Sequence, residues 1–185
     1  MPREFYARDT VTVARECLGK VLVHGSTAGR IVEVEAYLGL ADRASHAFRG
    51  PTSRARVMFG PPGHAYVYFI YGMYECVNFV TERDGTAGAV LIRALEPLAG
   101  LAAMQRRRPK ARRVEDLASG PGKLTLAMGI TRKLNGADLV AGPLTLRAQR
   151  EEPAFETAVG PRIGITHCAA WPLRFSVAGS GFVSG

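Results

Sequence analysis

Residues 30–38 alternate polar and apolar side chains, and this pattern does most to narrow what the chain can fold into. Because successive side chains of a β-strand point to opposite faces, the alternation predicts a strand with two unlike faces. The apolar face carries Val32, Val34, Ala36 and Leu38. The other face carries Glu33, Glu35 and Tyr37. That second face is either a solvated outer surface or a cleft wall, in which a carboxylate beside an aromatic ring can act as a general base.

Further strands and helices follow without a regular βαβ rhythm. We expect strands at residues 20–24, 65–71, 74–81, 87–95, 144–147, 161–166 and 173–177. We expect helices at residues 9–18, 97–107 and 122–128. Residues 39–63 are polar and rich in Gly, Pro, Ser and Arg, as in a long functional loop. The sequence therefore predicts one α+β domain over residues 1–185, with a mostly antiparallel sheet, flanking helices and a protruding hairpin at 65–81.

The composition restricts the kind of partner and the compartment. The 185 residues carry a net charge of +8, which fits a polyanionic partner or a chain that is simply rich in arginine. Cys17, Cys76 and Cys168 are widely spaced and the four histidines are scattered, so neither a zinc site nor a disulfide framework is expected. The sequence contains neither a secretory apolar core nor an apolar run long enough to cross a membrane. We therefore expect a cytoplasmic protein.

Arg93 interrupts an otherwise apolar strand at residues 89–95. A charge at such a position must be paired or must reach a polar cavity. Arg93 is therefore either half of a structural ion pair or an active-site cation that orients a carboxylate or holds a water molecule.

Tyrosines cluster around the predicted hairpin, where Tyr66, Tyr68, Tyr71 and Tyr74 fall within nine residues. Tyr71, Met73 and Tyr74 crowd its tip, where Asn, Asp or Gly would be usual. A tip of large apolar groups either packs on the core or acts as a wedge, as in proteins that open DNA from the minor groove.

Other polar groups allow two interpretations each. His46 lies in the long loop and is either a surface group or a flat ring that stacks on a base. The arginines of that loop and the basic run at residues 106–113 are either phosphate contacts or solvated side chains.

Six stretches, taken together, resemble the alkyladenine (3-methyladenine) DNA glycosylase family, also called the methylpurine glycosylases. They are RIVEVEAYLG (30–39), SHAFRGPTSRARVMF (45–59), AYVYFIYGMYECVN (65–78), VLIRALEPL (90–98), SGPGKL (119–124) and PRIGI (161–165). The stretches follow the family order, span nearly the whole chain and agree at polar and aromatic positions. The chain looks like a compact bacterial member of this family.

The resemblance implies excision of alkylated or deaminated purines from duplex DNA by a mixed fold that is unrelated to helix-hairpin-helix glycosylases. It implies that Glu35 is the general base that activates water, and that Arg93 and the backbone carbonyl of Ile165 hold this water. It implies no metal, no cofactor, no membrane and no obligate protein partner.

The resemblance also assigns the contacts with DNA. The flipped base would lie between the rings of Tyr37, His46 and Tyr68, and Asn78 would disfavour the exocyclic amine of guanine. Tyr71 would fill the gap left in the base stack. Met73 and Tyr74 would line the minor groove, and Thr52, Arg54 and Arg56 would contact phosphates.

Two other functions remain open at this point. A bifunctional glycosylase/lyase needs a desolvated amine in the pocket, such as that of Lys123. A non-catalytic nucleic-acid-binding domain does not need such an amine. A surface that binds phosphates should not present carboxylates, so burial of Glu33 or Glu35 beside Arg93 would argue against this last alternative.

Overall fold

A computed structural model describes residues 1–70, 72–150 and 154–184. Its α-helices are α1 (Arg3–Tyr6), α2 (Thr10–Cys17), α3 (Leu101–Arg107) and α4 (Pro121–Met128). Its strands are β1 (Val21–His24), β2 (Thr27–Tyr37), β3 (Ala65–Ile70), β4 (Tyr74–Val80), β5 (Ala89–Ala99), β6 (Leu144–Arg147), β7 (Thr157–Gly160) and β8 (Arg174–Val177). The expected mixed α+β fold is confirmed.

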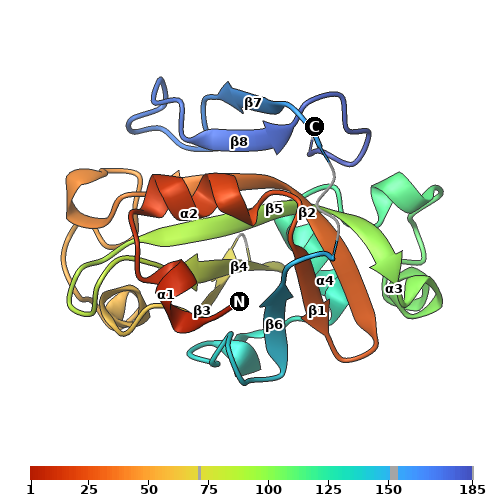
Figure 1. Ribbon diagram of the computed structural model, residues 1–185, viewed down its shortest axis with the longest axis horizontal. Helices are drawn as coiled ribbons and strands as arrows, with labels where there is room; N and C mark the ends of the chain where they lie inside the picture. The colour runs from red at the N-terminus through yellow and green to blue at the C-terminus, as the bar shows by residue number, and fades with distance from the viewer. Residues whose placement is uncertain (71, 151–153, 185) are drawn as a thin grey trace.

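The strands form one curled antiparallel sheet in the order β3-β4-β5-β2-β1-β6. Strand β2 is long enough to pair with β5 along its whole length, with β1 in its first half and with β8 in its second. Figure 1 shows β7 and β8 above the other strands, and β8 joins them to the sheet through its pairing with β2. The β3–β4 hairpin is at the other edge of the sheet, so the tyrosine-rich segment has a free side.

Two irregularities in the β2–β5 pairing lie side by side. Ile31 is opposite Leu95 and Glu33 is opposite Ala94, so the register skips Val32 on β2. The next pair joins Val34 to Ile92, so the register skips Arg93 on β5. Bulges of this kind re-aim side chains next to functional sites.

The helices cover the sheet where its faces are apolar. Helix α2 packs over β2 and β5, in front of the sheet in Figure 1, and α4 packs against β4 and β5. The helices and strands contribute to one cluster of buried apolar side chains, which includes Val13, Val34, Phe79, Ile92 and Leu124. None of the described helices is long and apolar enough to cross a membrane.

One expected element is wrong in part and another is wrong. The helix expected over 97–107 begins only at Leu101, because strand β5 continues to Ala99 and pairs there with β2. Gly100, with φ +75°, ends the strand. The strand expected over 161–166 does not form: the guanidinium of Arg162 and the N–H of Ile163 bind Ala36 and Glu35 of β2, and Gly164 adopts φ +75°. Helix α1, which was not predicted, packs through Phe5 and Tyr6 into the core.

Candidate active site

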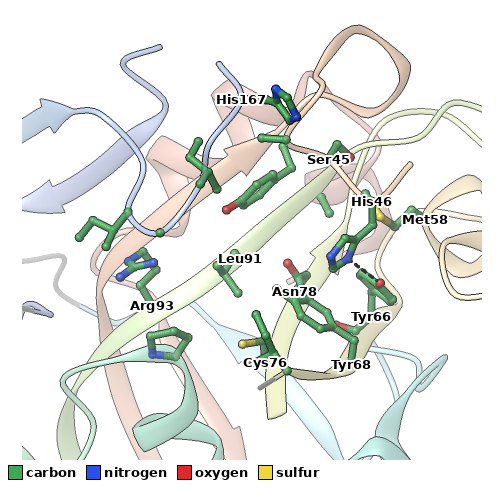
Figure 2. A pocket seen from close by; sticks show the side chains of 18 of the residues that line it. Ser45, His46, Met58, Tyr66, Tyr68, Cys76, Asn78, Leu91, Arg93 and His167 are labelled. Atoms are coloured by element: carbon green, nitrogen blue, oxygen red, sulfur yellow. Dashed lines mark hydrogen bonds between the residues drawn. The ribbon is translucent and has the colours of Figure 1, made fainter. Parts of the chain in front are cut away.

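A pocket of about 460 Å³ opens between the long loop, the middle of the sheet and residues 163–167 (Figure 2). Its volume lies within the range of small-molecule sites. Most lining side chains are aromatic or apolar, with a few polar groups. They include Ser45, His46 and Met58 from the loop, Tyr66, Tyr68, Cys76, Asn78, Leu91 and Arg93 from the sheet, Pro121 and Gly122 from α4, and Ile163, Ile165 and His167.

Glu35 lies behind this pocket with its carboxylate fully buried. Its Oε1 accepts a hydrogen bond from the N–H of Ile163 at 2.8 Å and lies 3.1 Å from Nη1 of Arg93. Its Oε2 accepts the hydroxyl of Tyr37 at 2.8 Å. Burial raises the pKa of Tyr37, and the neighbouring charge of Glu35 raises it further, so the phenol stays protonated as a donor. Tyr37, Arg93 and Ile163 all line the pocket, and the carboxylate is therefore one side chain away from it.

Arg93 joins the two carboxylates of the polar strand face. Its Nε lies 3.2 Å from Oε1 of Glu33, which is also fully buried, and its Nη2 donates to Oγ of Ser184 at 3.0 Å. The solvated outer face considered above is therefore wrong for both glutamates. Arg93 is paired inside the protein with both carboxylates, and it also lines the pocket.

An aromatic wall faces Arg93 across the pocket in Figure 2. The rings of His46 and Tyr68 meet edge to face, with centroids 4.6 Å apart. His46 Nδ1 lies 2.9 Å from the hydroxyl of Tyr66. Burial, followed by the charge of Arg54, lowers the pKa of His46 to about 4. His46 is therefore a neutral, half-buried ring, and its interpretation as a surface group is wrong.

Asn78 lies on the floor of the pocket and is almost fully buried. Its Nδ2 donates to the backbone carbonyl of Tyr66 at 3.0 Å, which fixes the amide against β3. The side chain thus has a defined orientation in the pocket.

The hairpin tip is not packed on the core where it is described. Met73 is 65% exposed and Tyr74 is 41% exposed, and Tyr74 also lines the pocket. The ring of Tyr74 lies against Gly122 at the start of α4, so closely that a Cβ there would be 2.8 Å from Cγ of the tyrosine. Tyr71 lies outside the described residues.

The three expected phosphate contacts are all exposed side chains of the long loop. Thr52 and Arg56 belong to a turn in which the Arg56 N–H donates to the carbonyl of Thr52. Arg54 lies over the ring of Tyr68, with its guanidinium carbon 4.9 Å from the centroid, and donates to the carbonyl of Phe69. Arg54 therefore packs against the aromatic wall and is also exposed to solvent.

Sequence reasoning did not find the pair formed by Asp42 and Arg162. Both side chains are fully buried, and the guanidinium binds both oxygens of the carboxylate and the carbonyl of Ala36. Burial alone would raise the pKa of Asp42, but hydrogen bonds from Arg162 and the backbone outweigh burial, and the pKa lies below its usual value. The pair ties the loop that carries His46 to the segment that carries Ile163 and Ile165. Residues 161–165 appear in a stretch that matches the family, but nothing in the sequence indicates their partner.

Comparison with known proteins places this chain in a family. A family model described as methylpurine-DNA glycosylase matches residues 4–181, nearly the whole chain. The chain belongs to the methylpurine-DNA glycosylase family. It is accordingly a DNA glycosylase, a hydrolase of base-excision repair.

Relatives from several organisms support the same assignment over full length. A protein of Methanoculleus marisnigri is 55% identical over 100% of this chain and 98% of its own length. One of Koribacter versatilis is 50% identical over 100% and 93%, and one of Legionella pneumophila is 45% identical over 100% and 97%. All three carry the name "Putative 3-methyladenine DNA glycosylase".

Two further features of the glycosylase bear on its chemistry. Lys123 is exposed and donates to Ser119, and no lysine is among the described residues that line the pocket. Across the described parts of the chain, no three His, Cys, Asp or Glu side chains come together as a metal site requires.

Proposed function

We propose that the whole chain, residues 1–185, acts as a single-domain, monofunctional glycosylase that removes alkylated or deaminated purines from duplex DNA. The substrates would be 3-methyladenine, 7-methylguanine, hypoxanthine and etheno-adenine. The enzyme would act as a cytoplasmic monomer, without a cofactor or an obligate protein partner. The observation that carries this proposal is the buried Glu35, held by Tyr37, Arg93 and Ile163 immediately behind an aromatic pocket.

The target base would leave the duplex to reach this pocket. Extrusion costs a few kcal/mol, and least for damaged or mispaired bases. Tyr71 would fill the vacated stack, while Met73 and Tyr74 would lie in the minor groove and Thr52, Arg54 and Arg56 would contact phosphates. The exposure of Met73 and Tyr74 supports such contacts, since large apolar side chains at a hairpin tip serve as wedges in other DNA-binding proteins.

The base would then stack with Tyr37, His46 and Tyr68. Stacking on aromatic rings contributes about 1–3 kcal/mol per base in nucleic-acid sites. A cationic alkylated purine gains a further attraction to the ring faces. Asn78, fixed by its bond to the carbonyl of Tyr66, would disfavour the exocyclic amine of guanine.

Bond cleavage would proceed by attack of water on carbon 1′ of the sugar. As the N-glycosidic bond breaks, its electron pair goes to the purine, so a cationic alkylated base leaves as a neutral molecule. A neutral base such as hypoxanthine leaves as an anion and takes up a proton from solvent. Positive charge develops on the sugar, and the carboxylate of Glu35 stabilises it and takes the proton from the attacking water. Arg93 and Ile165 both line the pocket, and Arg93 and the carbonyl of Ile165 would hold that water. Three of the roughly four acceptor positions of the carboxylate are occupied, which leaves one for water.

The two alternatives have less support. A lyase would need a desolvated amine, whereas Lys123 faces solvent. A non-catalytic phosphate-binding domain gains nothing from two carboxylates buried beside Arg93.

The proposal is tested with labelled duplexes that carry one hypoxanthine and with methylated genomic DNA. A monofunctional enzyme leaves abasic sites, so strand breaks are expected only after alkali treatment, and borohydride should trap no protein–DNA adduct. Breaks without alkali, together with a trapped adduct, would establish the lyase. Intact binding to DNA without release of any base would favour the binding module.

A further inference from the structure

A second buried carboxylate, that of Glu33, has no role in the reaction described above. It is fully buried, yet it does not line the pocket. Three donors meet it: Nε of Arg93 at 3.2 Å, Nη1 of Arg174 at 3.1 Å and the N–H of Ser184 at 2.7 Å. A buried ion pair is weak evidence for a stabilising role, because apolar residues often replace such groups without loss of stability. The burial of Glu33 therefore points to a role other than stability.

The geometry of Arg93 suggests what Glu33 does. A guanidinium is a rigid planar fork, so partners at two of its nitrogens define its plane. Glu33 binds Nε, and Oγ of Ser184 accepts from Nη2. Nη1 then points at Glu35, and the remaining N–H groups are available to the pocket that Arg93 lines.

The balance of charge leads to the same conclusion. Glu33 and Glu35 are matched by Arg93 and Arg174, so Arg93 is shared between two carboxylates rather than committed to one. Without Glu33, Arg93 would be free to rotate into a two-point pair with Glu35, the geometry that arginine and carboxylate favour. Such a pair would occupy the acceptor position that water needs and would draw the guanidinium away from the pocket.

We propose that Glu33 is a positioning residue for the excision reaction: together with Ser184, it holds Arg93 so that Glu35 keeps a free acceptor position beside the pocket. The inference rests on the proposed roles of Glu35 and Arg93. It also gives Ser184 a function, because its N–H donates to Glu33 and its Oγ accepts from Arg93.

The test compares the single-turnover excision of hypoxanthine from a duplex with the Kd for a duplex that carries a stable abasic-site analogue. For Glu33→Gln, we expect the rate to fall about 10- to 100-fold, because small misplacements of catalytic groups slow reactions by such factors. The Kd should stay within about 2-fold of wild type. Ser184→Ala should shift the rate in the same direction by a smaller factor. A merely structural role would change the folded fraction, which circular dichroism measures, and not the rate per folded molecule.

Glu82→Gln is the matched control. The carboxylate of Glu82 accepts from the N–H and hydroxyl of Thr10 at the start of α2, away from the pocket, so this variant should excise at the wild-type rate. Wild-type rates for both Glu33→Gln and Ser184→Ala would overturn the inference, as would a parallel loss of rate and affinity. If Glu33→Gln does not fold, Ser184→Ala decides in the same way. A wild-type protein that releases no purine contradicts the proposed function itself, and the inference falls with it.

Discussion

Arg162 lies over the ring of Tyr37, with its guanidinium carbon 4.6 Å from the ring centroid, while its two terminal nitrogens bind Asp42. One buried cation thus connects the tyrosine that donates to Glu35 with the loop that carries His46. This arrangement couples the stability of the fold to the geometry of the site.

Replacement of Asp42 by Asn tests that coupling. The change leaves the charge of Arg162 buried and unpaired, which typically costs about 3–5 kcal/mol. Urea unfolding should show this loss at neutral pH, where the carboxylate of wild-type Asp42 is ionised. Because the folded state depresses the pKa of Asp42, the contribution of the pair should persist above pH 4 and disappear as the pH falls through the folded pKa. Asp116→Asn, which breaks an exposed pair with Arg113, is the control and should leave the unfolding midpoint unchanged. A similar midpoint for both variants would contradict the account.

His46 should stay neutral throughout the physiological range. Its pKa of about 4 means that its imidazole NMR signals should not titrate between pH 5.5 and 8. The unfolded chain binds a proton near pH 6.5, so wild-type stability should decrease as the pH falls from about 6.5 towards 4. His46→Gln should reduce that decrease. Titration of His46 near pH 6.5 in the folded protein would contradict the buried, uncharged ring.

Gly122→Ala tests the contact between α4 and the hairpin. A Cβ at this position would lie 2.8 Å from Cγ of Tyr74, so the ring must move, and its partial exposure allows it to do so. We expect a change in stability of about 1 kcal/mol or less. The Kd for a damaged duplex, measured by fluorescence anisotropy, should rise about fivefold, which corresponds to about 1 kcal/mol.

The matched control for this change is Gly181→Ala, since a Cβ at Gly181 would have no atom within 4 Å. Equal affinities of the two variants for damaged DNA would show that the position of Tyr74 does not matter for binding.

Much of the sheet was predictable because its signals are local. Residues 30–38 alternate polar and apolar side chains as a half-buried strand does, and β2 covers Thr27–Tyr37. The alternation left open whether the polar face is solvated, and in the structure Glu33 and Glu35 are buried together with the charges that pair with them. Alternation of polar and apolar residues alone cannot distinguish a solvent-exposed strand face from one that carries buried ion pairs.

The parts of the site that were missed depend on contacts between distant segments. Asp42 and Arg162 are 120 residues apart, and Glu33 meets Ser184 across 151 residues. The bulge at Arg93 is likewise invisible in the sequence, because it arises from the register between β2 and β5. The unusual charge of Arg93 inside an apolar strand was visible in the sequence, and the structure shows this side chain paired with two carboxylates at the pocket.

The central claim is that the buried carboxylate of Glu35 activates the water that releases the base. The most direct test measures single-turnover excision of hypoxanthine by Glu35→Gln together with its Kd for the same duplex. The change keeps the shape of the side chain and removes its capacity as a base, so excision should fall by about 10²-fold or more while binding is retained. A Gln variant that excises at the wild-type rate would remove Glu35 from the reaction.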